Sequence, residues 1–162
     1  PAEPRRVELR NIATGAVKAW QDIASFEFAN ASTHLLLRRR PPQAAGGAGR
    51  GGDAGGTQGN AGAQTPAAGA PPPLRGVEVI VHNLTTGRDV PLGNVADIDF
   101  NRQGTLLAYT VDAASKDSNG LFVLDLSDNS VASLDNDAKR YTRLTWNDAG
   151  TGLAVLKGAD VE

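Results

Sequence analysis

Residues 100–109 read Phe-Asn-Arg-Gln-Gly-Thr-Leu-Leu-Ala-Tyr, and this segment has two ungapped counterparts in the chain. Residues 28–37 read Phe-Ala-Asn-Ala-Ser-Thr-His-Leu-Leu-Leu, and residues 146–155 read Trp-Asn-Asp-Ala-Gly-Thr-Gly-Leu-Ala-Val. Each copy begins with an aromatic residue, continues through a polar turn to a threonine, and ends in an apolar run. Recurrence at a fixed spacing is the sequence signature of a repeat architecture.

A second element recurs alongside the first. It reads Leu-Arg-Asn-Ile-Ala-Thr-Gly at 9–15, Val-His-Asn-Leu-Thr-Thr-Gly at 81–87 and Val-Leu-Asp-Leu-Ser-Asp-Asn at 123–129. Phe100 and Trp146 are 46 positions apart, and Phe28 and Phe100 are 39 apart once the 33-residue segment 41–73 is set aside. A period of about 40–45 residues with four short strands predicts the blades of a β-propeller.

The best copy of the repeat also predicts where the strands lie. We expect strands over 95–101, 105–112, 120–126 and 130–134, with a tight turn at 102–104. The two middle strands are nearly continuous apolar runs, which is typical of strands buried on both faces. Gly104 and Gly150 suit the positive φ of a short hairpin turn, and Ser32 stands at that position in the first copy. The fold class predicted is all-β.

The segment 41–73 differs from the rest of the chain, because 25 of its 33 residues are Gly, Ala or Pro. Such a composition buries too little apolar surface to offset the entropy of ordering its backbone. We expect a disordered insertion between the second and third strands of one blade.

The repeat map divides the chain into four parts. Residues 1–20 are the outer half of a preceding blade, 21–92 a blade that contains the insertion 41–73, 93–135 a complete blade, and 136–162 the inner half of a following blade. Closed propellers have about 4 to 8 blades, so this partial β-propeller is expected to be a piece of a larger one. Because half-blades present unpaired edges, the chain alone is expected to aggregate or to form oligomers.

Composition excludes several classes of function. The chain has 162 residues with 16 basic and 18 acidic side chains, a near-balance that argues against a nucleic-acid partner. It has no cysteine, which excludes disulfides, a thiol nucleophile and thiolate metal sites. No apolar run is long enough to predict a membrane span. The first residue is proline and methionine is absent, which suggests an internal excerpt or a processed product.

The repeat resembles that of bacterial propellers whose consensus is roughly Trp-Ser-Pro-Asp-Gly, a lysine-like residue, then Leu-Ala-Phe. Residues 100–104 with 107–109 match best, and 146–150 with 153–155 come next. Residues 121–126 resemble the accompanying Ile-Tyr-Val-Leu-Asp-Leu. Such repeats occur in TolB-type periplasmic proteins and in the amino-terminal propeller of prolyl-oligopeptidase-family serine peptidases. The long insertion favours the peptidases.

The resemblance implies a propeller that covers a C-terminal α/β-hydrolase domain of the same parent chain and admits short peptide substrates. The resemblance also implies that the catalytic Ser, Asp and His belong to that domain. The Gly-x-Ser-x-Gly motif of such a nucleophile does not occur in these residues. We therefore assign no catalytic residue, cofactor or metal to this segment. A periplasmic or secreted location follows from the resemblance only. The alternative is a non-enzymatic TolB-like or WD-repeat-like propeller that serves as a protein-binding platform.

Several motifs have a functional and a structural interpretation. Gly47–Gly52 satisfies the dinucleotide-binding pattern but lacks the flanking strand and helix that such a site requires, so we attribute it to chance. Arg38, Arg39 and Arg40 are interpreted as a solvated strand end rather than an anion site. His34 and His82 lie on neighbouring expected strands, yet no third metal ligand is apparent.

Three acidic or amide motifs remain. Asp97 and Asp99 share one face of an expected inner strand, where paired carboxylates can serve acid–base chemistry, but hydrogen bonding to turn amides is the favoured role. Residues 135–137, Asp-Asn-Asp, suggest calcium without the rest of its loop, so we expect a solvated turn. Asn30 and Asn83 fit the glycosylation string, which we attribute to coincidence.

Overall fold

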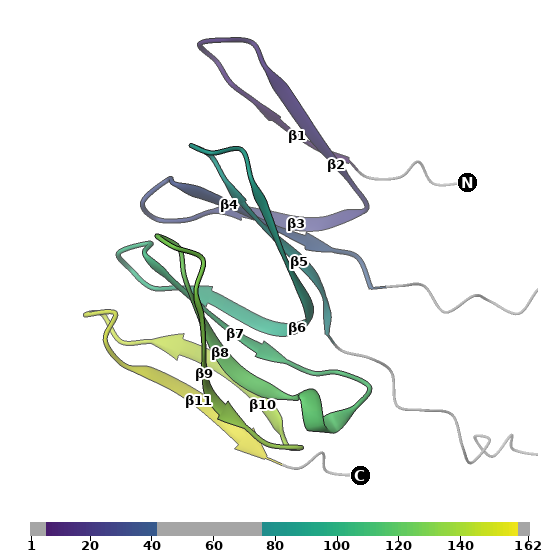
Figure 1. The fold of residues 1–162 in the computed structure, drawn as a ribbon, viewed down its shortest axis with the longest axis vertical. Helices are drawn as coiled ribbons and strands as arrows, with labels where there is room; N and C mark the ends of the chain where they lie inside the picture. Colours follow the sequence, from purple (N-terminus) through teal and green to yellow (C-terminus); the bar gives the residue numbers. More distant parts are fainter. Residues whose placement is uncertain (1–5, 42–75, 159–162) are drawn as a thin grey trace, which may run out of the picture. The chain divides into compact units, whose positions relative to one another are not determined.

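The computed structural model describes residues 6–41 and 76–158, and these form antiparallel β-strands with one short 3-10 helix, η1 (Lys116–Ser118). A first hairpin consists of β1 (Arg6–Arg10) and β2 (Val17–Gln21), and a last hairpin of β10 (Arg140–Trp146) and β11 (Leu153–Gly158). Between them seven strands pair in chain order, as Figure 1 shows: β3 (Ile23–Phe28), β4 (His34–Arg39), β5 (Val77–Asn83), β6 (Asp89–Phe100), β7 (Leu106–Val111), β8 (Gly120–Asp125) and β9 (Val131–Asn136). The all-β class is confirmed.

The long strand β6 belongs to two sheets. Residues 89–92 pair with β5, residues 98–100 pair with β7, and Val95 between them is paired with both neighbours. Asn94 adopts a φ of 54°, and both pairings shift register at this point. The seven strands are therefore two four-stranded meanders that share β6, as the predicted partial propeller requires. The exact blade limits stay a prediction.

Asparagine side chains build the turn between the first and second strands of two repeats. The Oδ1 atom of Asn101 accepts hydrogen bonds from the backbone N–H groups of Thr105 (2.9 Å) and Leu106 (3.0 Å). Asn147 makes the equivalent pair of bonds in the next repeat. Gly104 follows at a φ of 67°, as predicted for that position. The sequence pattern did not reveal the role of the asparagine, whose place Ala29 takes in the first copy.

The second recurring element forms the turn after each third strand. Asn83 accepts hydrogen bonds from the N–H groups of Thr85 and Thr86, and Asn11 does the same in the first hairpin. Both turns end in a glycine with φ near +70°, Gly15 at 72° and Gly87 at 71°. Side-chain acceptors and positive-φ glycines thus explain why the chain reverses at these points.

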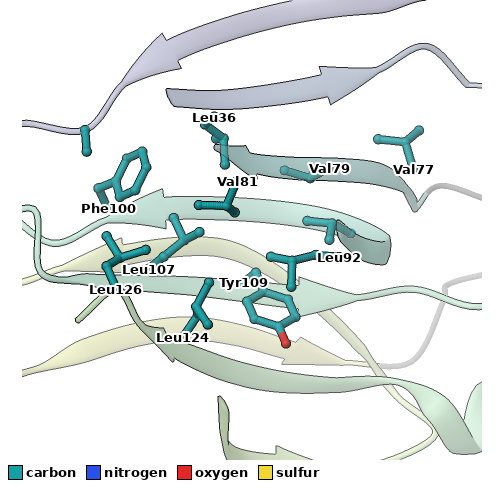
Figure 2. Packing of buried hydrophobic residues seen from close by; sticks show 12 residues of the cluster. Leu36, Val77, Val79, Val81, Leu92, Phe100, Leu107, Tyr109, Leu124 and Leu126 are labelled. Atoms are coloured by element: carbon teal, nitrogen blue, oxygen red, sulfur yellow. The ribbon is translucent and has the colours of Figure 1, made fainter. Parts of the chain in front are cut away.

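The main core lies between the two four-stranded sheets, and Figure 2 shows its side chains. Its buried members include Leu36, Val79 and Val81 from the first sheet, and Phe100, Leu107, Tyr109 and Leu124 from the second. Two smaller clusters lie on the outer faces of these sheets. One includes Trp20, Leu35 and Leu37, and the other includes Ala108, Tyr141 and Leu144. Apolar contacts on both faces of β4 and β7 explain their continuous apolar sequences.

Candidate functional site

An open pocket lies beside the innermost strands of the two four-stranded sheets. Its volume is about 210 Å³, and β3, β4 and β6 form its walls. It is lined by Ser25, Phe26, Glu27, Leu36, Arg38 and Ile98. Because β3 is the edge strand of the seven-stranded sheet, one row of its backbone groups has no strand partner among the described residues. Most of its side chains are also exposed.

Arg38 forms one wall of this pocket and ties the two sheets together. Its guanidinium donates hydrogen bonds to the carbonyl oxygens of Ala96 and Val95 on β6. The neighbouring Arg39 donates to Glu78 Oε1 at 2.8 Å. The expectation of a solvated strand end is therefore wrong for Arg38, whereas Arg39 pairs with Glu78 at the surface and Arg40 is exposed.

The carboxylates of Asp97 and Asp99 both lie on β6, and Asp97 accepts hydrogen bonds from backbone N–H groups. Asp97 Oδ2 accepts a hydrogen bond from the N–H of Leu144 on β10 (2.9 Å), and Oδ1 accepts one from Ile98 (3.1 Å). The favoured role was hydrogen bonding to turn amides. Asp97 does bind backbone amides, but they lie on strands, so the expected turn is wrong. Burial, with the charge of Asp97 second, raises the pKa of Asp99.

The pocket occurs where the first repeat lacks the Asp97 carboxylate. Ser25 occupies the corresponding position, three residues before the repeat's aromatic residue. It is too short to reach across to β6 as Asp97 reaches to Leu144. The N–H of Ile98, which corresponds to that of Leu144, is bound by Asp97 of its own strand instead. A local sequence difference between repeats therefore coincides with the opening.

The two histidines do not form a ligand pair. Leu35 is the strand partner of His82, so His34, one residue earlier on β4, points to the opposite face of the sheet. His34 lies 2.9 Å from Thr33 Oγ1 and 3.1 Å from Asn83 Nδ2. Among residues 6–41 and 76–158, no group of three His, Cys, Asp or Glu side chains is arranged to hold a metal ion.

His82 instead belongs to a polar cluster that joins β2 to the next sheet. Asp89 Oδ1 lies 2.6 Å from His82 Nδ1 and 3.0 Å from Lys18 Nζ, while Asp89 Oδ2 accepts from Trp20 Nε1 at 3.2 Å. Burial alone would raise the pKa of Asp89, but hydrogen bonds from His82, Lys18 and Trp20 outweigh it and lower that pKa. No local sequence signal indicated this cluster.

The acidic run at 135–137 also differs from its prediction. Asp135 and Asn136 belong to β9 and not to a solvated turn. Asp135 Oδ2 accepts hydrogen bonds from Lys157 Nζ (2.6 Å) and Tyr141 OH (2.9 Å), and Asp137 lies 3.0 Å from the same amine. These carboxylates hold the pKa of Lys157 well above its usual range. The run is thus paired with a lysine of the neighbouring β10–β11 sheet.

The two asparagines of the glycosylation strings both make hydrogen bonds to backbone groups. Asn83 is a turn acceptor, and Asn30 Nδ2 donates to the carbonyl oxygen of Asn101 at 3.4 Å. Gly47–Gly52 and nearly all of the insertion 41–73 lie outside the described residues.

The surroundings of His34 predict a loss of stability on acidification. Burial, with His82 second, lowers the pKa of His34 below 6.5, so the unfolded chain binds this proton at a higher pH than the folded one. The free energy of unfolding should therefore fall as the pH drops below about 6.5. In the His34→Gln variant, urea unfolding between about pH 7 and pH 5 should show a shallower decline. An unchanged decline would contradict this origin, whereas carboxylates such as Asp89 act at lower pH.

Comparison with known proteins gives structural similarities only. No protein-family model matches the chain, and no curated protein matches it in sequence. The β-propeller domain of the Trilobed protease from Pyrococcus furiosus is 18% identical over 49% of this chain and 26% of its own, with a TM-score of 0.41. Acylaminoacyl peptidase from Pyrococcus horikoshii is 17% identical over 48% of this chain and 12% of its own, with a TM-score of 0.39.

TolB from Acinetobacter baumannii is 14% identical over 99% of this chain and 34% of its own, with a TM-score of 0.49. The chain thus spans between 12% and 34% of the length of these three proteins. A peptidase propeller and TolB are the kinds of protein that the repeat motif resembles. Separately, no helix in the described part of the chain has the length and apolarity of a membrane span.

Proposed function

We propose that this chain is the propeller segment of a prolyl-oligopeptidase-like serine peptidase, in which it admits and selects peptide substrates. Catalysis would take place in an α/β-hydrolase domain of the same parent polypeptide. The resemblance of the repeats to those of prolyl-oligopeptidase-family propellers supports the proposed assignment to that family. The observation that carries the selecting role is the pocket beside the inner strands, where the Glu27 carboxylate stands next to an unpaired strand edge.

The chemistry of this pocket suits an extended peptide. The unpartnered N–H and C=O groups of β3 offer hydrogen bonds to a peptide backbone, as in other proteins that add a strand to a sheet edge. Leu36 and Ile98 supply apolar contact for a side chain. Arg38 is committed to carbonyl oxygens of β6, so Glu27 provides the selecting charge. Peptides with basic side chains should therefore be preferred.

The test uses the parent polypeptide with Glu27→Gln. We expect KM for a peptide with basic side chains to rise on the order of fivefold, because an exposed ion pair contributes about 1 kcal/mol. Hydrolysis of a small uncharged ester should keep its kcat. The matched control is Glu78→Gln, which removes an exposed carboxylate on β5 that pairs with Arg39 and does not line the pocket. Equal KM values for Glu27→Gln and the unaltered protein would contradict the proposal.

One measurement distinguishes the peptidase proposal from its alternative, a non-enzymatic TolB-like or WD-repeat-like binding platform. A serine-directed organophosphorus reagent should label the parent polypeptide in its hydrolase domain, at a serine within Gly-x-Ser-x-Gly. Absence of labelling, together with absence of that motif downstream, would favour the platform. The proposed location remains periplasmic or secreted, on the resemblance of the repeats.

A further inference from the structure

The pocket beside β3 lies at an interface between two sheets that has a counterpart one repeat later. Ser25 and Arg38 line the pocket and are strand partners, so their side chains share one face of the first four-stranded sheet. The repeat aligns Ser25 with Asp97 and Arg38 with Thr110, which lie at the following interface. Described strands form both sides of each interface, so the difference between the two is a property of these residues.

A carboxylate of the chain itself fills the following interface. Asp97 Oδ2 accepts a hydrogen bond from the N–H of Leu144 on β10 at 2.9 Å, and the N–H of Asp97 donates to Thr110 Oγ1 at 3.0 Å. In the first interface the shorter Ser25 replaces this aspartate, and an open volume of about 210 Å³ lies beside it. The pocket therefore corresponds to the position that a carboxylate occupies one repeat later.

The two interfaces also differ in charge. Ser25 in place of Asp97 removes one negative charge, and Arg38 in place of Thr110 adds one positive charge. Arg38 uses only its Nη2 amino group to bind the carbonyl oxygens of β6. Its Nη1 and Nε groups have no hydrogen-bond partner among residues 6–41 and 76–158, so they can donate to a ligand. The pocket thus offers both the space and the cation that a carboxylate requires.

We propose that the pocket binds the C-terminal carboxylate of a peptide, with Arg38 as the hydrogen-bond donor. This inference rests on the proposed function and specifies which part of the peptide enters the pocket. Leu36 is the buried member of the lining and belongs to the core between the two sheets, so a chain that enters the pocket ends there. Glu27 follows Ser25 by two residues on β3, which is about 7 Å along the strand. One short peptide can therefore place its carboxylate at Arg38 and a basic side chain at Glu27.

The first test compares two peptides that differ only at the C-terminus. The parent polypeptide is first treated with the serine-directed reagent, so that it cannot hydrolyse them. Calorimetry then gives the dissociation constants of acetyl-Ala-Lys-Ala as the free acid and as the amide. The free acid should bind about tenfold more tightly, because the amide lacks the charged hydrogen-bond acceptor for Arg38. Equal dissociation constants overturn the proposal.

A third peptide distinguishes a terminal carboxylate from one on a side chain. The amide of acetyl-Ala-Lys-Asp has its carboxylate on the last side chain only, and it should bind no better than the amide of the first peptide. Binding as tight as that of the free acid would overturn the assignment to the C-terminus.

The second test supplies a carboxylate to the pocket from the chain itself. Ser25→Asp introduces the residue that the next repeat has at this position, so the ratio of the two dissociation constants should fall from about ten to about one. The matched control is Ser133→Asp, which changes an exposed serine on β9 outside the pocket and should keep the ratio. A ratio that persists in Ser25→Asp, or that falls equally in Ser133→Asp, overturns the proposal.

Glu27→Gln separates this inference from the proposed function. It should weaken the binding of both the free acid and the amide and leave their ratio unchanged, because both peptides carry the same lysine. Equal binding of the two peptides, with the effect of Glu27→Gln intact, overturns only the carboxylate assignment. A preference for the free acid that persists without any effect of Glu27→Gln overturns only the proposed selection of basic side chains.

Discussion

Gly104→Ala is expected to destabilise the protein by about 2–5 kcal/mol. Gly104 has a φ of 67°, where a residue with a Cβ is strained. The added Cβ would also lie 2.6 Å from the backbone nitrogen of Ala31 and 2.9 Å from its Cβ. Ala31 belongs to the corresponding turn of the preceding repeat, and the close contact is with its backbone and Cβ rather than with the end of a flexible side chain. The substitution therefore forces two stacked turns apart.

Gly87→Ala is the matched control for this prediction. Gly87 has nearly the same φ, 71°, but an added Cβ would meet nothing within 4 Å. Its cost should be limited to the backbone strain, about 1–2 kcal/mol. Urea unfolding of both variants under identical conditions gives the comparison. Equal losses in the two variants would show that the contact between turns has no energetic role.

Leu107→Ala should produce the other large loss, about 2–5 kcal/mol. Leu107 is fully buried in the cluster between the two four-stranded sheets, among residues such as Val81, Phe100 and Leu124. Removing three carbon atoms there loses apolar burial and leaves a cavity that paired strands on both sides prevent from closing. Loss of this contact weakens the association of two sheets rather than one hairpin.

The control for Leu107 is Val131→Ala on β9, where the side chain is half exposed. We expect a change within about 0.5 kcal/mol, as for most surface substitutions. Thermal or urea unfolding measures both. A Leu107→Ala variant as stable as Val131→Ala would mean that the two sheets do not share a core.

Local chemistry made much of the fold predictable. The turn at Gly104, the strands on either side of it and the insertion site between β4 and β5 all follow from turn residues and apolar runs. Hydrogen bonding of Asp97 to backbone amides was also expected, from the habit of aspartate in turns, although the amide that it reaches in the next sheet lies on a strand. The role of the turn asparagines, such as Asn101, was not predicted. Their side-chain oxygens accept hydrogen bonds from backbone N–H groups, and the sequence does not show where those groups lie.

The site was less accessible to sequence reasoning. Arg38 was taken for a solvated residue, yet it hydrogen-bonds to carbonyl groups of a strand 57 and 58 positions away. The bond between Lys18 and Asp89 joins residues 71 positions apart. Neither residue type nor spacing indicates which surfaces of two sheets pack against each other. These contacts, and the pocket beside them, can therefore be seen only in the tertiary structure.

The amino-acid order alone therefore determined the period of the repeat, the strand positions and the turns, because each depends on groups a few residues apart. Stacking of the sheets decided which of the equivalent positions are buried. Phe28 and Phe100 have the same local pattern, but only Phe100 has a complete neighbouring sheet over it. Burial depends on what lies across the interface, and no local pattern contains that information.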